Sequence, residues 1–148
     1  MLRLYLDNCC YNRPFDDQTQ LKINLETLAK LFIQQLIIDE QAEMIWSYML
    51  FTENFDNPFV QRRDAIMDFS KHAVDTICEN NEILQKAQII QKTGIKGKDS
   101  IHIACAIFGK CDFMITTDNR MLKYNSNEIK IVDPIEFIRI WEGESKHE

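Results

Sequence analysis

The sequence predicts an α/β fold, namely a three-layer α/β/α sandwich around a central, mostly parallel sheet. Short segments rich in β-compatible residues alternate with longer segments whose apolar residues recur at helical spacing. Such alternation is typical of a parallel sheet covered by helices on both faces. Only 4 glycines and 3 prolines occur, which argues against a sandwich of strands joined by tight turns. The 148 residues suit one domain, which we assign to 1–142 with a polar, frayed tail at 143–148.

The first expected elements are a strand at 2–6, a loop at 12–17 and a long helix. The strand is short, rich in β-compatible residues, and stops at Asp7. The helix is expected to pack one face inward, because apolar residues recur along it at helical spacing. These residues are Leu21, Leu25, Leu28, Phe32 and Leu36.

The middle of the chain continues the alternation, with strands expected at 43–46 and 74–78. Two helices are expected between these strands, and a third follows the second strand. Side chains that can cap a helix, or a glycine that can end one, mark the boundaries. They are Ser47 before the first helix, Asn80 or Asn81 before the third, and Gly94 after the third.

The last part of the chain should contain two strands and two helices. Asp99 is expected to open a helix, the strand at 113–117 ends at Asp118, and the last strand covers 129–132. The segment 133–136 supplies an N-cap, a proline at the first helical position and an acid three residues after the cap, which predicts the last helix.

Four acids are expected to meet at one end of the sheet. In parallel α/β sheets, ligands collect beyond the carboxyl ends of the strands. Asp7 and Asp118 each follow a strand directly. Asp99 lies at a helix start, where the helix dipole favours a negative charge. Glu53 lies almost two turns into the helix that Ser47 can cap, so all four can point into one cleft.

Clustered carboxylates repel one another, and their pKa values rise unless a positive charge lies between them. A divalent cation resolves this conflict, since magnesium takes oxygen ligands and keeps several waters. One water made more acidic by the metal can attack a phosphodiester, and a second metal can stabilise the departing oxygen. The cation would also let a chain of net charge -6 hold a phosphate backbone. Glu40 and Glu43 are rivals of Glu53, although they come before or within the second strand.

Four segments resemble the PIN-domain nucleases, which include the VapC-like toxins of bacterial toxin–antitoxin systems. They are 5–8, 47–50 leading to Glu53, 97–106 and 113–118, and the resemblance runs nearly the whole length of the chain. It implies a three-layer α/β/α fold, a Mg²⁺ or Mn²⁺ site with one or two ions, and cleavage of single-stranded RNA. The positions that match the family's acids are Asp7, Glu53, Asp99 and Asp118.

The resemblance also implies partners, namely RNA, a cognate antitoxin if the protein is a toxin, and a second copy in a homodimer. Asn119 stands where many members have another acid, which puts the second metal in question. A catalytically weak scaffold or RNA-binding module with the same fold is therefore the alternative. A phospho-acceptor receiver domain fits less well, because it needs an acidic pair after the first strand and a lysine after a late one.

Several other residues are candidates for supporting roles. Asn8, Thr117 and Asn119 could orient a carboxylate, a water or a phosphate, whereas Thr116 is expected to pack in its strand. Basic residues near the expected cleft could contact RNA phosphates, which position a nucleic acid without reading its sequence. These are Arg13, Lys96, Lys98, Arg120 and Lys123. Aromatic residues are expected in the core rather than as base-stacking platforms: Trp46, Phe55, Phe59 and Trp141.

Cysteine usage indicates a reducing compartment, and we expect a cytoplasmic protein. The five cysteines are odd in number and lack a CxxC pair. Cys9, Cys10 and His102 do not have the spacing of a structural zinc site, so His102 is expected to pack or to support the acids from behind. The apolar stretch at 2–6 is too short for a signal peptide, and no window is long and apolar enough to span a bilayer.

Overall fold

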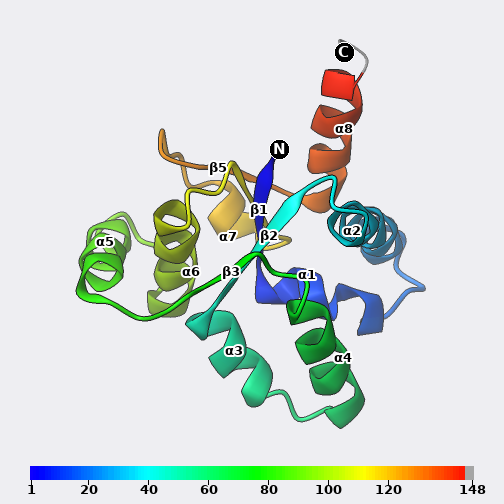
Figure 1. Ribbon diagram of the computed structural model, residues 1–148, viewed down its shortest axis with the longest axis horizontal. Helices are drawn as coiled ribbons and strands as arrows, with labels where there is room; N and C mark the ends of the chain where they lie inside the picture. The colour runs from blue at the N-terminus through cyan, green and yellow to red at the C-terminus, as the bar shows by residue number, and fades with distance from the viewer. Residues whose placement is uncertain (146–148) are drawn as a thin grey trace.

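Five parallel strands form one sheet in the order β3–β2–β1–β4–β5 (Figure 1). The computed structural model describes residues 1–145, and the side chains of residues 1–143. The strands are β1 Arg3–Leu6, β2 Glu43–Ser47, β3 Asp75–Ile77, β4 Phe113–Ile115 and β5 Lys130–Val132. The predicted α/β fold with a parallel sheet is therefore confirmed.

Helices cover both faces of the sheet. Figure 1 shows α5 and α6 on one side of it and α2 and α8 on the other, while α3 and α4 extend beyond one end of the strands. The helices within residues 1–145 are α1 Asn8–Asn12, α2 Leu21–Ile38, α3 Tyr48–Phe55, α4 Val60–Ser70, α5 Asn81–Gln91, α6 Gly97–Phe108, α7 Asn119–Leu122 and α8 Pro134–Ser145, with a 3₁₀ turn at Arg13–Phe15. None of them combines the length and apolar character that crossing a bilayer requires.

The strand order creates a switch point between β1 and β4. From the central β1 the chain adds β2 and β3 on one side, and then returns to add β4 and β5 on the other. Leu6 is paired with Ile115, and the N–H of Asp7 donates to the carbonyl of Ile115 at 2.9 Å. The residues that follow β1 and β4 therefore lie side by side at the point where α/β folds bind ligands.

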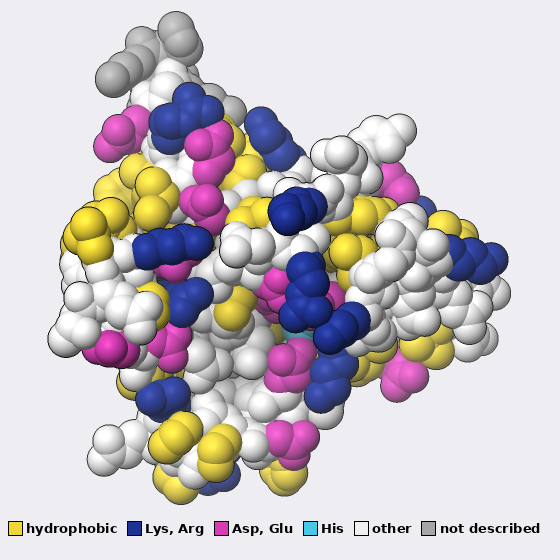
Figure 2. Space-filling model, turned by 180° about the vertical axis from the view of Figure 1, so that it is seen from behind, with side chains coloured by type: hydrophobic (Ala, Val, Ile, Leu, Met, Phe, Trp, Pro, Cys, Tyr) yellow, Lys and Arg dark blue, Asp and Glu magenta, His cyan; other side chains and the backbone are white. Residues whose placement is uncertain are grey.

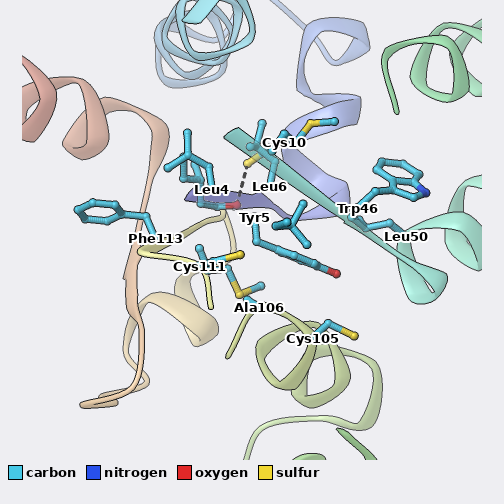
Figure 3. Packing of buried hydrophobic residues seen from close by; sticks show 14 of the residues in the cluster. Leu4, Tyr5, Leu6, Cys10, Trp46, Leu50, Cys105, Ala106, Cys111 and Phe113 are labelled. Carbon is cyan, nitrogen blue, oxygen red and sulfur yellow. Dashed lines mark hydrogen bonds between the residues drawn. The ribbon is translucent and has the colours of Figure 1, made fainter. Parts of the chain in front are cut away.

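The core lies on both faces of β1. Leu4, Tyr5 and Leu6 are each 0% exposed. Successive side chains of a strand point to opposite faces, and Figure 3 shows Leu4 and Leu6 toward Cys10, with Tyr5 directed toward Cys105 of α6. A strand buried on both faces explains why this segment is apolar at every position and not at alternate ones.

The predicted inward face of α2 is wrong except at Leu36. Leu25, Leu28 and Phe32 are exposed and line a groove together with Ile135 and Ile138 of α8. The side chains that α2 buries are Glu26, Thr27, Ala29, Lys30, Ile33, Leu36 and Ile37. Both stripes have helical spacing, so periodicity could not decide which one faces the sheet.

Several element boundaries also differ from the predictions. The short helices α1 and α7 were not expected, and β4 stops two residues before the expected end at 117. Gly94, with φ +104°, lies in the turn three residues after α5 ends at Gln91. The helix α8 continues to Ser145, so the first residues of the expected tail are helical, and 146–148 lie outside the described residues.

The cap of α5 offers a test of its predicted boundary. The side-chain oxygen of Asn80 accepts from the N–H of Ile83 at 2.9 Å. We expect Asn80→Ala to lower the free energy of unfolding by about 1 kcal/mol, because a helix N–H loses its partner. Urea unfolding measures this loss, and Asn81→Ala is the control inside the first turn. Equal losses in the two variants would contradict the assignment of the cap to Asn80.

Candidate functional site

Asp7 lies at the carboxyl end of β1, at the switch point of the sheet. It is 5% exposed and caps the short helix α1 by accepting from the N–H of Asn8 at 2.8 Å. Its other carboxylate oxygen accepts from the hydroxyl of Thr116 at 2.9 Å and from the thiol of Cys9 at 3.3 Å. A buried carboxylate is thus held by three donors that leave its charge unneutralised.

Thr116, and not Thr117, is the threonine whose hydroxyl contacts an acid. Its hydroxyl also accepts from the N–H of Asp118 at 3.1 Å, so one side chain joins two of the predicted acids. Thr117 reaches the site through its backbone, because its N–H donates to the sulfur of Cys9 at 3.3 Å. The expectation that Thr116 only packs in its strand was therefore wrong: β4 ends at Ile115, and Thr116 already belongs to the site.

Glu53 enters the site from α3. The hydroxyl of Ser47 caps this helix by accepting from the N–H of Leu50 at 3.1 Å, as the sequence predicted. Glu53 Oε1 is hydrogen-bonded to Nε2 of His102, which is 1% exposed on α6. The same nitrogen lies 3.7 Å from Asp7 Oδ1, so the imidazole stands between two of the acids.

His102 gains positive character from this position. Burial by itself lowers the pKa of His102, but the hydrogen bond to Glu53 and the charges of Asp7, Glu53 and Asp99 outweigh burial and raise the pKa above its usual value. Cys9 and His102 both lie against Asp7, since the thiol of Cys9 is 3.3 Å from Oδ2 and Nε2 of His102 is 3.7 Å from Oδ1.

Asp99 lies in the first turn of α6, which begins two residues earlier than expected, at Gly97. Burial raises the pKa of Asp99, and the negative charges of Asp7, Asp118 and Glu53 raise it further, against the opposing effect of His102. The field of each of the other three acids therefore reaches Asp99. Four carboxyl groups that are far apart in the chain share one electrostatic environment.

Asp118 lies at the start of α7, next to β4. Its carboxylate accepts from the N–H of Arg120 at 2.8 Å, and the guanidinium of Arg120 lies 3.9 Å away. Asn119, the predicted replacement for a further acid, is the first residue of α7 and is exposed. Asn8 is likewise tied into the local backbone, because the amide of Asn12 donates to both its carbonyl and its side chain.

The donors suit a hard divalent cation in their chemistry. Carboxylate oxygens are the ligands that Mg²⁺ and Mn²⁺ prefer, and the raised pKa of Asp99 shows the crowding of charge that a cation would relieve. Within residues 1–145, however, no three His, Cys, Asp or Glu side chains are arranged as a ready ligand set. The hydrogen bond to His102 engages only Oε1 of Glu53, and the cap of α7 engages only Oδ1 of Asp118, so each acid keeps a second oxygen that these bonds do not use.

Of the predicted RNA contacts, four are exposed and one is engaged elsewhere. Lys96, Lys98, Arg120 and Lys123 are exposed on α6, α7 and the residues next to these helices. Arg13 is bound to Asp16 at 3.1 Å and to Glu26 at 3.4 Å, and so is not free for phosphate. Figure 2 shows a face on which acidic side chains gather around a hollow with lysine and arginine side chains beside them.

Two of the aromatic residues expected in the core are at the surface. Phe55 is 69% exposed and Phe59 is 55% exposed, whereas Trp46 is buried as expected. The guanidinium of Arg62 stacks over Phe59 at 4.3 Å and over Phe15 at 5.4 Å. Phe55 ends α3 and Phe59 precedes α4, and Figure 1 shows these two helices beyond one end of the strands.

Sequence reasoning expected His102 to pack or to support the acids, which its bond to Glu53 agrees with, but it missed the roles of Tyr5 and Ser47 behind the imidazole. Tyr5 and Ser47, both 0% exposed, join His102 in a hydrogen-bonded chain that ends at Glu53. In the sequence Tyr5 is an ordinary strand residue and His102 is an isolated histidine on an apolar helix. No spacing rule connects positions on three different elements.

Comparison with known proteins identifies the fold. No family model matches the chain, and no curated protein matches its sequence. Among solved structures, a chain of VapBC2 from Rickettsia felis, crystallised with a DNA fragment from their promoter, is 14% identical with a TM-score of 0.53, over 88% of this chain and 97% of that one. A chain of DNA-bound VapBC from Salmonella typhimurium is 15% identical with a TM-score of 0.53, over 90% of this chain and 99% of that one. The protein therefore shares the fold of these VapBC chains, which agrees with the PIN-like fold that the sequence predicted.

Proposed function

We propose that the protein is a metal-dependent endoribonuclease that hydrolyses phosphodiester bonds of single-stranded RNA. The main support is the placement of the acids at the switch point of the sheet: His102 lies between Asp7 and Glu53, and Thr116 joins Asp7 to Asp118. The charges of these three acids add to the burial that raises the pKa of Asp99. A shared field among acids that are remote in the chain is typical of a functional site. The fold shared with VapBC chains supports the same reading.

The residues of the chain would divide the work between them. Asp7 is the most firmly held acid and would anchor a cation with the help of Thr116. Asp99 and Asp118 would complete the ligand set, with Glu53 presented from α3. When bound, Mg²⁺ or Mn²⁺ supplies an acidified water and neutralises charge on the phosphate. Lys96, Lys98, Arg120 and Lys123 would hold the flanking phosphates, because all four are exposed.

Removing the metal should abolish the activity. We expect cleavage of an end-labelled, unstructured RNA with MnCl₂ or MgCl₂, no cleavage with EDTA, and recovery when excess MnCl₂ follows EDTA. The physical reason is that clustered carboxylates without a cation repel both one another and the phosphate. Gel analysis of the products measures the result. Cleavage that persists in EDTA would refute the metal-dependent mechanism.

A scaffold or RNA-binding module is the second candidate function. It is favoured by the engagement of Glu53 with His102 and of Asp118 with the start of α7, together with Asn119 in place of an acid. Mn²⁺ binding measured by calorimetry without cleavage of any RNA would support this candidate over the nuclease.

A small antitoxin is the protein partner that we propose for a nuclease of this fold, and a second copy of the chain is a further candidate. The neighbours are VapBC assemblies, which motivates the search for such a partner. An antitoxin segment would block the cleft by placing a basic side chain among the acids.

Since the five cysteines are free thiols, we expect the protein to act in the reducing cytoplasm.

A further inference from the structure

A buried chain of hydrogen bonds runs from the start of α3 to the acid on the same helix. The hydroxyl of Ser47 lies 2.7 Å from the hydroxyl of Tyr5, which in turn lies 2.6 Å from Nδ1 of His102. Nε2 of His102 is bonded to Glu53. This series of hydrogen bonds therefore links Ser47 of β2 to Tyr5 of β1, then to His102 of α6, and ends at Glu53 of α3.

The donors and acceptors in this chain assign its direction. An ionised Glu53 only accepts, so Nε2 of His102 carries a hydrogen whether the ring is neutral or protonated. When the ring is neutral, Nδ1 accepts from Tyr5. Burial raises the pKa of Tyr5 well above its usual value, which keeps its hydroxyl protonated and able to donate. Ser47 accepts from the N–H of Leu50 and can donate to Tyr5. Every link then has one donor and one acceptor.

We propose that His102 is a positioning residue that aims Glu53 at the cation, and that Ser47 and Tyr5 fix the orientation of the imidazole. This inference rests on the proposed nuclease function and adds the residues that orient one of its acids. The hydrogen bond engages Oε1 of Glu53 and leaves Oε2 as the oxygen that would bind a cation. Groups that orient a metal ligand from behind usually contribute strongly to metal affinity.

A matched pair of variants tests this role. In His102→Gln the side-chain nitrogen can occupy the place of Nε2 and donate to Glu53, whereas in His102→Asn the shorter amide reaches only the place of Nδ1. We expect His102→Asn to weaken Mn²⁺ binding by about 10- to 100-fold, and His102→Gln to stay close to the wild type. The free Mn²⁺ signal in electron paramagnetic resonance measures the affinity without any RNA. Equal affinities in His102→Asn and the wild type would overturn the proposal.

A double-mutant cycle separates positioning from a general loss of structure. His102→Asn should have no further effect on Mn²⁺ affinity in a Glu53→Gln background, because His102 is proposed to act through Glu53. The same loss in both backgrounds would show that His102 acts elsewhere. Thermal unfolding checks that each variant folds. If His102→Asn does not fold, Tyr5→Phe replaces it, since this variant keeps the ring and loses only the hydroxyl that orients His102.

A nuclear magnetic resonance experiment distinguishes failure of the proposed positioning role of His102 from failure of the nuclease proposal. The ¹⁵N shifts of the His102 ring, recorded at alkaline pH without metal, should show the hydrogen on Nε2 in the wild type and a changed pattern in Tyr5→Phe. A wild-type ring with its hydrogen on Nδ1 would overturn the proposed positioning role of His102 even if Mn²⁺ binds. Absence of Mn²⁺ binding by the wild type would refute the metal role, whatever the ring shows.

Discussion

Replacing Asp7 with asparagine should reduce RNA cleavage by at least about 100-fold, which exceeds the loss typical of groups that only orient a ligand. Asparagine keeps an oxygen that can accept from the N–H of Asn8, so α1 keeps its cap. The negative charge is lost, and an amide is a weaker partner than a carboxylate for a hard cation. Because Asp7 is 5% exposed, solvent cannot substitute for it.

Asp112→Asn is the matched control for Asp7→Asn. Asp112 lies directly before β4, at the opposite end of the sheet from the acids, and accepts from the N–H of Arg3 at 2.8 Å. The same chemical change there should leave cleavage near the wild-type rate. Initial rates on a labelled RNA, with circular dichroism to verify folding, measure both variants. A folded Asp7→Asn enzyme that cleaves at the wild-type rate would remove Asp7 from the mechanism.

Asp99→Asn is expected to abolish cleavage to a similar extent while it stabilises the metal-free protein. Burial and the charges of Asp7, Asp118 and Glu53 raise the pKa of Asp99, so its ionised form is unfavourable in the folded state. At neutral pH we expect Asp99→Asn to raise the free energy of unfolding by less than about 1 kcal/mol, because solvent screens the repulsion at a partly buried group.

The pH dependence of stability follows from the direction of this shift. The folded state holds the proton of Asp99 more tightly than the unfolded state does. The contribution of Asp99 to stability therefore falls as the pH rises from its unfolded pKa through its folded pKa. In Asp99→Asn the free energy of unfolding should not show this decline. Plotted against pH, the free energies of the wild type and the variant should therefore converge at acid pH and separate at neutral pH.

Urea unfolding in EDTA at several pH values measures the difference between wild type and Asp99→Asn. Added Mn²⁺ should stabilise the wild type more than the variant, because a ligand stabilises only the state that binds it. Asp112→Asn again serves as the control and should show no gain in EDTA. If Asp99→Asn were less stable than the wild type at neutral pH, the claim that burial and neighbouring charges disfavour an ionised Asp99 would be contradicted.

Much of the fold follows from local patterns in the sequence. A central parallel strand is buried on both faces, which explains why the segment around Leu4 is apolar at each position and was recognisable. Ser47 was recognisable as a cap because a short polar side chain precedes the apolar start of a helix, and Asn80 was one of two candidates for the cap of α5. The errors occur where two local patterns compete. The buried stripe of α2, which includes Glu26, Thr27 and Lys30, has the same period as its more apolar exposed stripe, and only contact with the rest of the fold decides between them.

The supporting residues of the site required three-dimensional information. Thr116 was assigned to strand packing, because the sequence does not show that β4 ends at Ile115. Arg13 appeared to be available for RNA, because nothing local indicates that it pairs with Glu26. Phe59 was expected in the core, since the exposure of an aromatic residue depends on what the rest of the chain packs against it.

The sequence by itself determined the class of fold and the acids that follow or flank its strands, because both depend on periodicity and on the few residues at element ends. The tertiary structure decided the strand order that puts the end of β1 next to the end of β4. It also decided that His102 and Tyr5 stand behind Glu53. Hydrogen bonds between residues 49 and 97 positions apart depend on packing between elements, which no local pattern encodes.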